Sequence, residues 1–166
     1  MAKITFKGDT VNTYNNLPEV GAQAPDFTLV KSDLSEIKLS HLKGKNVILN
    51  IFPSIDTGVC AASVRRFNKD ATSVNNTIVL GISADLPFAA QRFCAAEGID
   101  NVITLSTFRN AEFGKEYGLL MEDGPLKGLL ARAVMVLDTE GKIVYKELVP
   151  EIAQEPNYES AINSIV

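Results

Sequence analysis

Two cysteines are the residues of this sequence best suited to redox chemistry. Cys60 and Cys94 are the only cysteines in the chain. A thiolate attacks peroxides and disulfides, whereas a cysteine that only fills space in a core is inert. A purely structural disulfide is improbable in a reducing compartment. Count and spacing therefore leave two interpretations open, an active pair or two inert core thiols.

The single histidine, His41, leaves little material for other kinds of site. A Cys/His metal centre needs several such ligands, and a Ser-His-Asp triad needs a histidine beside its nucleophile. His41 stands in the polar stretch SHLKGK and is interpreted as a solvated helix residue. No motif for a metal, haem or flavin is present, so we expect no cofactor.

The segment NIFPSIDTGVC, residues 50–60, places Cys60 where a strand gives way to a helix. The apolar run 46–52 is typical of a central strand buried on both faces, and it ends at Pro53. Thr57 is a candidate N-cap, which puts Cys60 in the first helical turn. Free backbone amides and the positive end of the helix dipole stabilise a thiolate there, at the sheet edge where α/β folds bind ligands. The alternative is a small hydrophobic residue that happens to lie near a helix start.

Arg132 is the second residue in an unusual place. It stands between Ala131 and Ala133 at the head of an apolar strand. A guanidinium there must either reach solvent or find an anion, because burying it unpaired is very costly. The sequence alone favours neither outcome.

The remaining elements alternate strands with helices and end in a hairpin and a helix. This order predicts a three-layer α/β fold with a mixed sheet. Without repeats or linkers, residues 1–166 are expected to form one domain. Strands are expected at 27–30, 37–39, 46–52, 77–83, 101–106, 132–138 and 142–149, helices at about 59–71, 87–97, 110–119 and 158–166, and an N-terminal hairpin at 3–15 that turns at 7–9.

Charge and hydropathy exclude several classes of partner. The net charge is −4 and no basic run exceeds a pair of residues, which argues against nucleic acid and anionic membranes. No stretch approaches the roughly 18 apolar residues needed to span a bilayer. The start, MAKITFKGDT, lacks the apolar core of a signal peptide. We therefore expect a soluble protein located in the cytoplasm.

The pattern Pro53-x-x-x-Thr57-x-x-Cys60 resembles the active-site signature of the peroxiredoxins. Longer blocks narrow the resemblance to the bacterial thiol peroxidase branch, the atypical two-cysteine peroxiredoxins, and they cover essentially the whole chain. Position 58 is Gly where some members have Pro. The blocks are NIFPSIDTGVCAASVRRFN (50–68), ISADLPFAAQRFCAAEGI (82–99), TLSTFRNAEFG (104–114), GPLKGLLARAV (124–134) and EPNYE (155–159).

The resemblance implies a thioredoxin-like fold with an added N-terminal β-hairpin, and it implies a role for each site residue. Cys60 would be the peroxidatic cysteine and Cys94 the resolving cysteine. Thr57 would donate to or orient the peroxide and the sulfur. Arg132 would hold the thiolate and polarise the peroxide oxygens, while Pro53 would shield the sulfur and shape the pocket.

The implied reaction is antioxidant reduction of alkyl hydroperoxides and hydrogen peroxide. Cys60 becomes a sulfenic acid, Cys94 closes a disulfide with it, and thioredoxin reduces that disulfide. The resemblance also implies a homodimer. Two rivals remain: a thiol–disulfide oxidoreductase, against which position 63 is Ser rather than the second Cys of Cys-x-x-Cys, and a binding domain with inert thiols.

Overall fold

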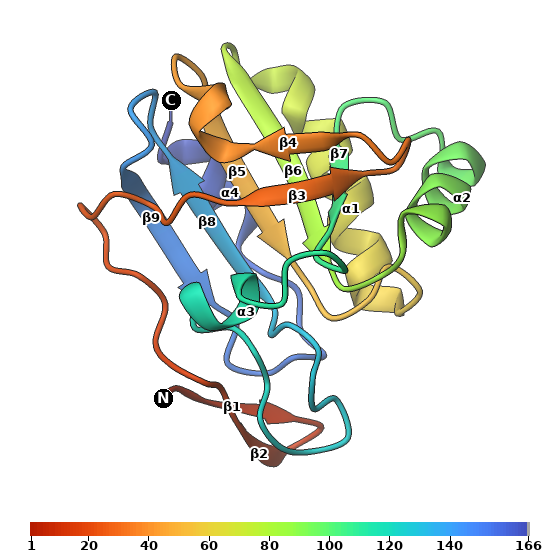
Figure 1. Ribbon diagram of the computed structural model, residues 1–166, viewed down its shortest axis with the longest axis vertical. Helices are drawn as coiled ribbons and strands as arrows, with labels where there is room; N and C mark the ends of the chain where they lie inside the picture. Colours follow the sequence, from red (N-terminus) through yellow and green to blue (C-terminus); the bar gives the residue numbers. More distant parts are fainter. Residues whose placement is uncertain (166) are drawn as a thin grey trace.

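The computed structural model describes residues 1–165, and its centre is a mixed sheet of seven strands (Figure 1). The strands run in the order β4-β3-β7-β6-β5-β8-β9. β5 pairs with β6 in parallel and with β8 antiparallel, which confirms the predicted mixed sheet. The strands are β3 (Thr28–Lys31), β4 (Glu36–Lys38), β5 (Asn46–Ile51), β6 (Thr77–Ser83), β7 (Ile103–Ser106), β8 (Ala133–Leu137) and β9 (Ile143–Leu148).

β5 is buried on both faces, as its continuous apolar sequence predicts. Val47, Leu49 and Ile51 belong to one buried cluster. Ile48 and the following Phe52 belong to a second cluster on the other face. Successive side chains of a strand point to opposite faces, so both sets are apolar only where both faces are covered.

Helices cover one face of the sheet, and a mixture of loops and short helical turns covers the other (Figure 1). α1 (Gly58–Asp70) and α4 (Tyr158–Asn163) pack together, with the rings of Phe67 and Tyr158 edge to face at 5.2 Å. α2 (Pro87–Glu97) connects β6 to β7 and packs against β7. Within residues 1–165, no helix combines the length and apolar character needed to cross a membrane.

The bounds of α2 match the prediction closely because both ends carry local signals. Pro87 is the first helical residue, where its missing N–H costs nothing. Gly98 follows the last turn with φ of 66°, the left-handed conformation that glycine adopts readily. α4 is shorter than the predicted 158–166, and Val166 lies outside the described residues.

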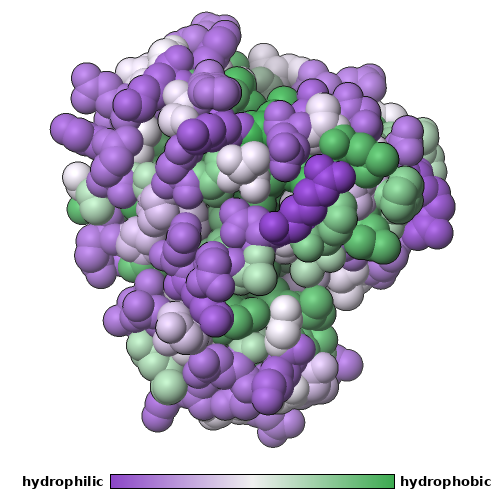
Figure 2. All heavy atoms as spheres, viewed as in Figure 1, coloured by the Kyte–Doolittle hydropathy of each residue, from purple (hydrophilic) through white to green (hydrophobic). Residues whose placement is uncertain are grey.

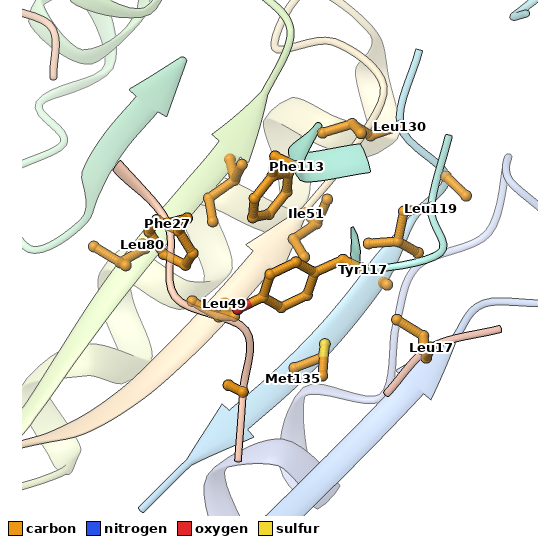
Figure 3. Packing of buried hydrophobic residues seen from close by; sticks show 14 of the residues in the cluster. Leu17, Phe27, Leu49, Ile51, Leu80, Phe113, Tyr117, Leu119, Leu130 and Met135 are labelled. Carbon is orange, nitrogen blue, oxygen red and sulfur yellow. The ribbon is translucent and has the colours of Figure 1, made fainter. Parts of the chain in front are cut away.

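The predicted helix at 110–119 is only partly correct, because α3 is a single turn, Phe113–Glu116. Gly118 has φ of 69° and ends the helical conformation. The apolar residues in this segment belong instead to a buried aromatic cluster, in which the rings of Phe113 and Tyr117 stack with their centroids 4.6 Å apart (Figure 3). The ring of Phe27 meets both of them edge to face.

The N-terminal hairpin forms a separate two-stranded sheet below the main body in Figure 1. β1 (Lys3–Phe6) and β2 (Asp9–Asn12) are joined by Lys7 and Gly8, both at positive φ. The turn is thus one residue shorter than predicted, and it has the twist that suits a two-residue hairpin. Thr5 holds the hairpin to the segment after β9, since its N–H donates to Pro150 O at 2.8 Å and its carbonyl accepts from Ile152 N at 2.9 Å.

Candidate active site

Cys60 lies in the first turn of α1, directly after the loop that follows β5. The loop leaves the sheet in a fixed direction, because Phe52 N–H donates to Ile82 O at 3.0 Å. Cys60 is the third residue of the helix, and its side chain is fully buried. The predicted position of this cysteine at a strand-to-helix junction is therefore correct.

Thr57 occupies the N-cap position of α1, but its side chain does not cap the helix. Its backbone is extended, as an N-cap requires, and no side-chain capping hydrogen bond forms. The Oγ1 hydroxyl instead donates to Ser54 O at 3.1 Å. The single hydroxyl hydrogen is thereby committed to the loop, and the lone pairs of the oxygen remain available as acceptors.

Arg132 is buried, with 2% of its surface exposed, and its guanidinium reaches Cys60. Nη2 donates to Cys60 Sγ at 3.2 Å, and Nε donates to Ile152 O at 2.8 Å. Within residues 1–165, the buried Nη1 atom has no hydrogen-bond partner. Of the two outcomes left open by the sequence, the arginine has found a sulfur rather than solvent.

A cavity of about 240 Å³ opens beside this pair. It is lined by residues from the hairpin, the Cys60 loop and the segment after β9, and most of the lining is apolar. It brings together three of the predicted residues, Pro53, Thr57 and Arg132. The other lining residues include Phe6, Lys7, Val59, Leu126, Ile152 and Ala153.

A second cavity, of about 290 Å³, lies elsewhere on the molecule. Val47 and Leu137 line it, and these residues pair where β5 begins and β8 ends. Cys60 follows the opposite end of β5. None of the predicted site residues lines this larger cavity.

Neither cysteine lines the cavity. Cys60 is fully buried and is linked to the cavity through Arg132, which is not true of Cys94. Cys94 lies within α2, half-buried against the second core cluster, and both cysteines are free thiols. Burial raises the pKa of the Cys94 thiol above its usual value, and a hydrogen bond with Thr104 opposes part of that increase. In this arrangement Cys94 is a protonated, poorly nucleophilic group at neutral pH.

Two ion pairs tie α2 to the region of Cys60. Arg65 of α1 donates through Nε and Nη2 to both carboxylate oxygens of Glu97, each at 3.0 Å. Arg92 of α2 reaches Asp56 of the loop before α1 at 3.4 Å. All four side chains are at least one-third exposed, so salt screens these pairs.

Ser63 stands where a Cys-x-x-Cys protein would carry its second cysteine. Its side chain is fully buried, and Oγ donates to Cys60 O at 2.8 Å. The same oxygen accepts from Asn50 Nδ2 at 3.1 Å. The hydroxyl joins α1 to the central strand, so this position has a structural explanation that needs no thiol.

Sequence reasoning missed the partner that orients Arg132. That partner is the backbone carbonyl of Ile152, which lies in the segment after β9. A carbonyl carries no residue-type signature, and only the fold brings it to the guanidinium. The described residues, 1–165, hold no cluster of three or more His, Cys, Asp or Glu side chains that could bind a metal ion.

A cysteine in the first turn of a helix after a central strand, facing a buried arginine, is typical of thiol-dependent redox proteins. The Redoxin family matches residues 19–162. The chain is also 53% identical over 165 residues to the thiol peroxidases of Mycobacterium tuberculosis and Mycobacterium bovis, covering 99% of this chain and 99% of each relative. It therefore belongs to the redoxin family and, within it, to the thiol peroxidases, a group of peroxiredoxin enzymes.

Solved structures show the same fold. A peroxiredoxin-like protein from Aquifex aeolicus superposes with a TM-score of 0.94 at 38% identity, over 99% of this chain and 96% of that one. A thiol peroxidase from Chromobacterium violaceum gives a TM-score of 0.88 at 21% identity, over 95% and 91% of the two chains. The expected thioredoxin-like fold with an N-terminal hairpin is thereby confirmed.

Proposed function

We propose that residues 1–166 act as one domain that reduces hydroperoxides, with Cys60 as the peroxidatic cysteine. The observation that carries this proposal is the 3.2 Å hydrogen bond from Arg132 Nη2 to Cys60 Sγ. A buried guanidinium at this distance stabilises negative charge on the sulfur, and a thiolate is the nucleophilic form of cysteine.

In the first step, the Cys60 thiolate attacks the terminal oxygen of the hydroperoxide. The S–O bond forms as the O–O bond breaks, and the departing oxygen takes up a proton and leaves as an alcohol or as water. Cys60 is left as a sulfenic acid. The oxidant is the hydroperoxide itself, so the step needs no metal or organic cofactor.

Three neighbours of Cys60 assist this step. Arg132 Nη1 has no partner among residues 1–165 and can donate to the peroxide oxygens as charge develops on them. Thr57, whose hydrogen is held by Ser54 O, accepts a hydrogen bond from the peroxide O–H rather than donating one. Pro53 forms a wall of the cavity and keeps water from the sulfur.

In the second step, the Cys94 thiol condenses with the sulfenic acid, which forms a disulfide and releases water. A disulfide needs Cα atoms about 4.4–6.8 Å apart, whereas packed helix axes lie about 8–10 Å apart. The first turn of α1 and part of α2 must therefore unwind. α2 suits this motion because Pro87 is its only buried residue.

The third step returns the enzyme to its dithiol form. We infer that thioredoxin supplies the electrons by thiol–disulfide exchange through a mixed disulfide. Such recycling requires a reducing compartment, so we place the enzyme in the cytoplasm. The unwound, oxidised form offers its sulfurs to a protein reductant more readily than the packed form does.

The cavity favours alkyl hydroperoxides as substrates, with hydrogen peroxide as a smaller alternative. Phe6, Leu126 and Ile152 give it an apolar lining from three different segments. An alkyl group placed there leaves water and gains favourable burial. Comparing kcat/KM for cumene hydroperoxide and hydrogen peroxide tests this preference, and a clear preference for hydrogen peroxide would count against it.

We also propose that the chain forms a homodimer. Three large apolar side chains, Leu86, Phe88 and Phe108, are about half exposed or more. They follow β6 and β7, whose ends are paired through Ser83 and Ser106, so they lie at the sheet edge that carries the Cys60 loop. Figure 2 shows apolar residues on the right of the view, where Figure 1 places α2. Sedimentation of the wild type and a Phe88→Glu variant tests this proposal.

Peroxide titration of two cysteine variants tests the proposed function. The wild type should lose two free thiols per chain with one equivalent of peroxide. Cys60→Ser should lose none and have no peroxidase activity, whereas Cys94→Ser should consume one equivalent and then stop turning over with thioredoxin. Normal turnover by Cys94→Ser would refute the resolving role, and unreactive wild-type thiols would favour the inert-core interpretation.

A further inference from the structure

Asp85 lies between the two cysteine-bearing segments and takes part in none of the three proposed chemical steps. It follows β6 and precedes α2 by two residues. Its Oδ1 accepts from Ser54 Oγ at 2.8 Å, and its Oδ2 accepts from Ile55 N at 2.6 Å and from Ser83 Oγ at 2.6 Å. One carboxylate thus joins the Cys60 loop to the segment that leads into the Cys94 helix.

The donors that meet this carboxylate are largely withdrawn from water. Ile55 is 2% exposed and Ser83 is 5% exposed. Hydrogen bonds to a charged acceptor are stronger than neutral ones, and a buried donor left unpaired is costly. Asp85 therefore fixes the course of the loop more firmly than a neutral contact would.

A short chain of hydrogen bonds carries this restraint to the cavity. Ser54, which Asp85 holds by its hydroxyl, presents its carbonyl to Thr57. That carbonyl accepts from Thr57 N at 3.2 Å and from Thr57 Oγ1 at 3.1 Å. The orientation of the Thr57 hydroxyl, and the start of the helix that carries Cys60, thus depend on where Asp85 holds Ser54.

We propose that Asp85 is a positioning residue that holds the Cys60 loop and the start of the Cys94 helix together in the reduced enzyme. Its hydrogen bonds to both segments break when the disulfide forms. This inference rests on the proposed roles of the two cysteines. The bonds of Asp85 belong to the packed arrangement, in which peroxide reacts. They stabilise the dithiol form more than the disulfide form, in which the first turn of α1 and part of α2 have unwound.

The variant Asp85→Asn separates this role from a purely structural one. Asparagine keeps one acceptor oxygen and loses the charge, so it cannot serve Ser54 Oγ and the two donors on Oδ2 equally well. We expect the dithiol–disulfide equilibrium to shift about tenfold toward the disulfide. For a two-electron couple this makes the midpoint potential more negative by about 30 mV. The second-order rate constant for peroxide should fall by about tenfold, because Thr57 is no longer held in place.

The experiment measures both quantities in three purified variants. Redox titration against dithiothreitol gives the midpoint potential, and stopped-flow mixing with hydrogen peroxide gives the rate constant. Ser54→Ala removes one donor while leaving the carboxylate, so it should shift both values in the same direction by a smaller factor. Asp138→Asn is the matched control, since Asp138 accepts from two backbone amides in the β8–β9 turn, away from the cysteines.

The inference is overturned if Asp85→Asn keeps the wild-type potential, even if its thermal stability falls. It is equally overturned if Asp138→Asn shifts the potential as much. Should Asp85→Asn fail to fold, the midpoint potential of Ser54→Ala becomes the test. A wild-type potential in that variant would then refute the inference. A wild-type protein that forms no Cys60–Cys94 disulfide would instead refute the proposed function, and this inference with it.

Discussion

Replacing Arg132 by lysine keeps the positive charge near Cys60 but removes the planar fork. The guanidinium uses Nη2 for the sulfur and Nε for Ile152 O, and its Nη1, which has no partner among residues 1–165, is the atom proposed to meet the peroxide. An ammonium group is a single point of charge on a flexible stem. It cannot meet the sulfur, the carbonyl and a peroxide oxygen at the same time.

The size of the effect follows from the hydrogen bonds that are lost. A hydrogen bond to a charged group contributes about 1.5–3 kcal/mol, and each 1.36 kcal/mol corresponds to about a factor of ten in rate. Removing one oxyanion donor from other enzymes costs roughly 10²–10³ in rate. We therefore expect Arg132→Lys to lower kcat/KM for hydroperoxides by roughly 10² or more. The Ile152 carbonyl, left without its donor, should also lower the free energy of unfolding by about 1–3 kcal/mol.

Stopped-flow measurement of the first oxidation step isolates this effect from later turnover. Arg66→Lys is the matched control, because Arg66 forms a partly exposed pair with Asp70 within α1. An Arg132→Lys variant that reacts with peroxide at the wild-type rate would show that the observed contact with the sulfur has no part in catalysis.

Three further outcomes are expected. Burial raises the pKa of the Cys94 thiol above its unfolded value, so the stability that the protonated thiol gives the packed α2 helix is complete below about pH 8.5 and is lost as the pH rises. The rate of disulfide closure after one equivalent of peroxide should therefore increase above that pH. A rate that does not change with pH would contradict this. Hydrogen exchange should show weaker protection of residues 57–64 and 89–97 in the oxidised form, and equal protection would refute unwinding. Gly118→Ala should lower the free energy of unfolding by at least about 2 kcal/mol, since the new Cβ would lie 2.2 Å from Asn16 O at a positive φ. Gly21→Ala, with open space around it, should lower the free energy of unfolding by less, and calorimetry on both variants measures the difference.

The parts of the fold that could be predicted carry their signals locally. The runs that became β5 and β6 are mostly apolar because both faces of those strands are covered. Pro87 and Gly98 mark the ends of α2 by their own backbone preferences. The strand-to-helix junction at Cys60 follows from the same kind of pattern.

The parts that could not be predicted depend on contacts between distant segments. The pattern of apolar residues around Phe113 predicts a long helix, but those residues pack on Phe27 and the chain turns at Gly118. The hydroxyl of Thr57 prefers Ser54 O to the helix amides that a cap would satisfy. The sequence shows an arginine near an apolar strand, but it does not show that the Ile152 carbonyl will orient it.

The attachment of the N-terminal hairpin has a consequence for the order of events during biosynthesis. Thr5 donates its backbone N–H to Pro150 O and its hydroxyl hydrogen to Glu151 Oε2, partners 145 and 146 positions further along the chain. Contacts of such large sequence separation form late, because closing a long loop costs entropy that only the finished contact repays. A chain emerging from the ribosome exposes Thr5 early, yet it lacks this partner segment until synthesis is almost complete. That same segment supplies Ile152, the acceptor for Arg132 and a wall of the cavity. A nascent chain therefore contains Cys60 long before the Ile152 carbonyl that orients Arg132 has been synthesised, and the contact between Arg132 and the sulfur can form only when the polypeptide is almost complete.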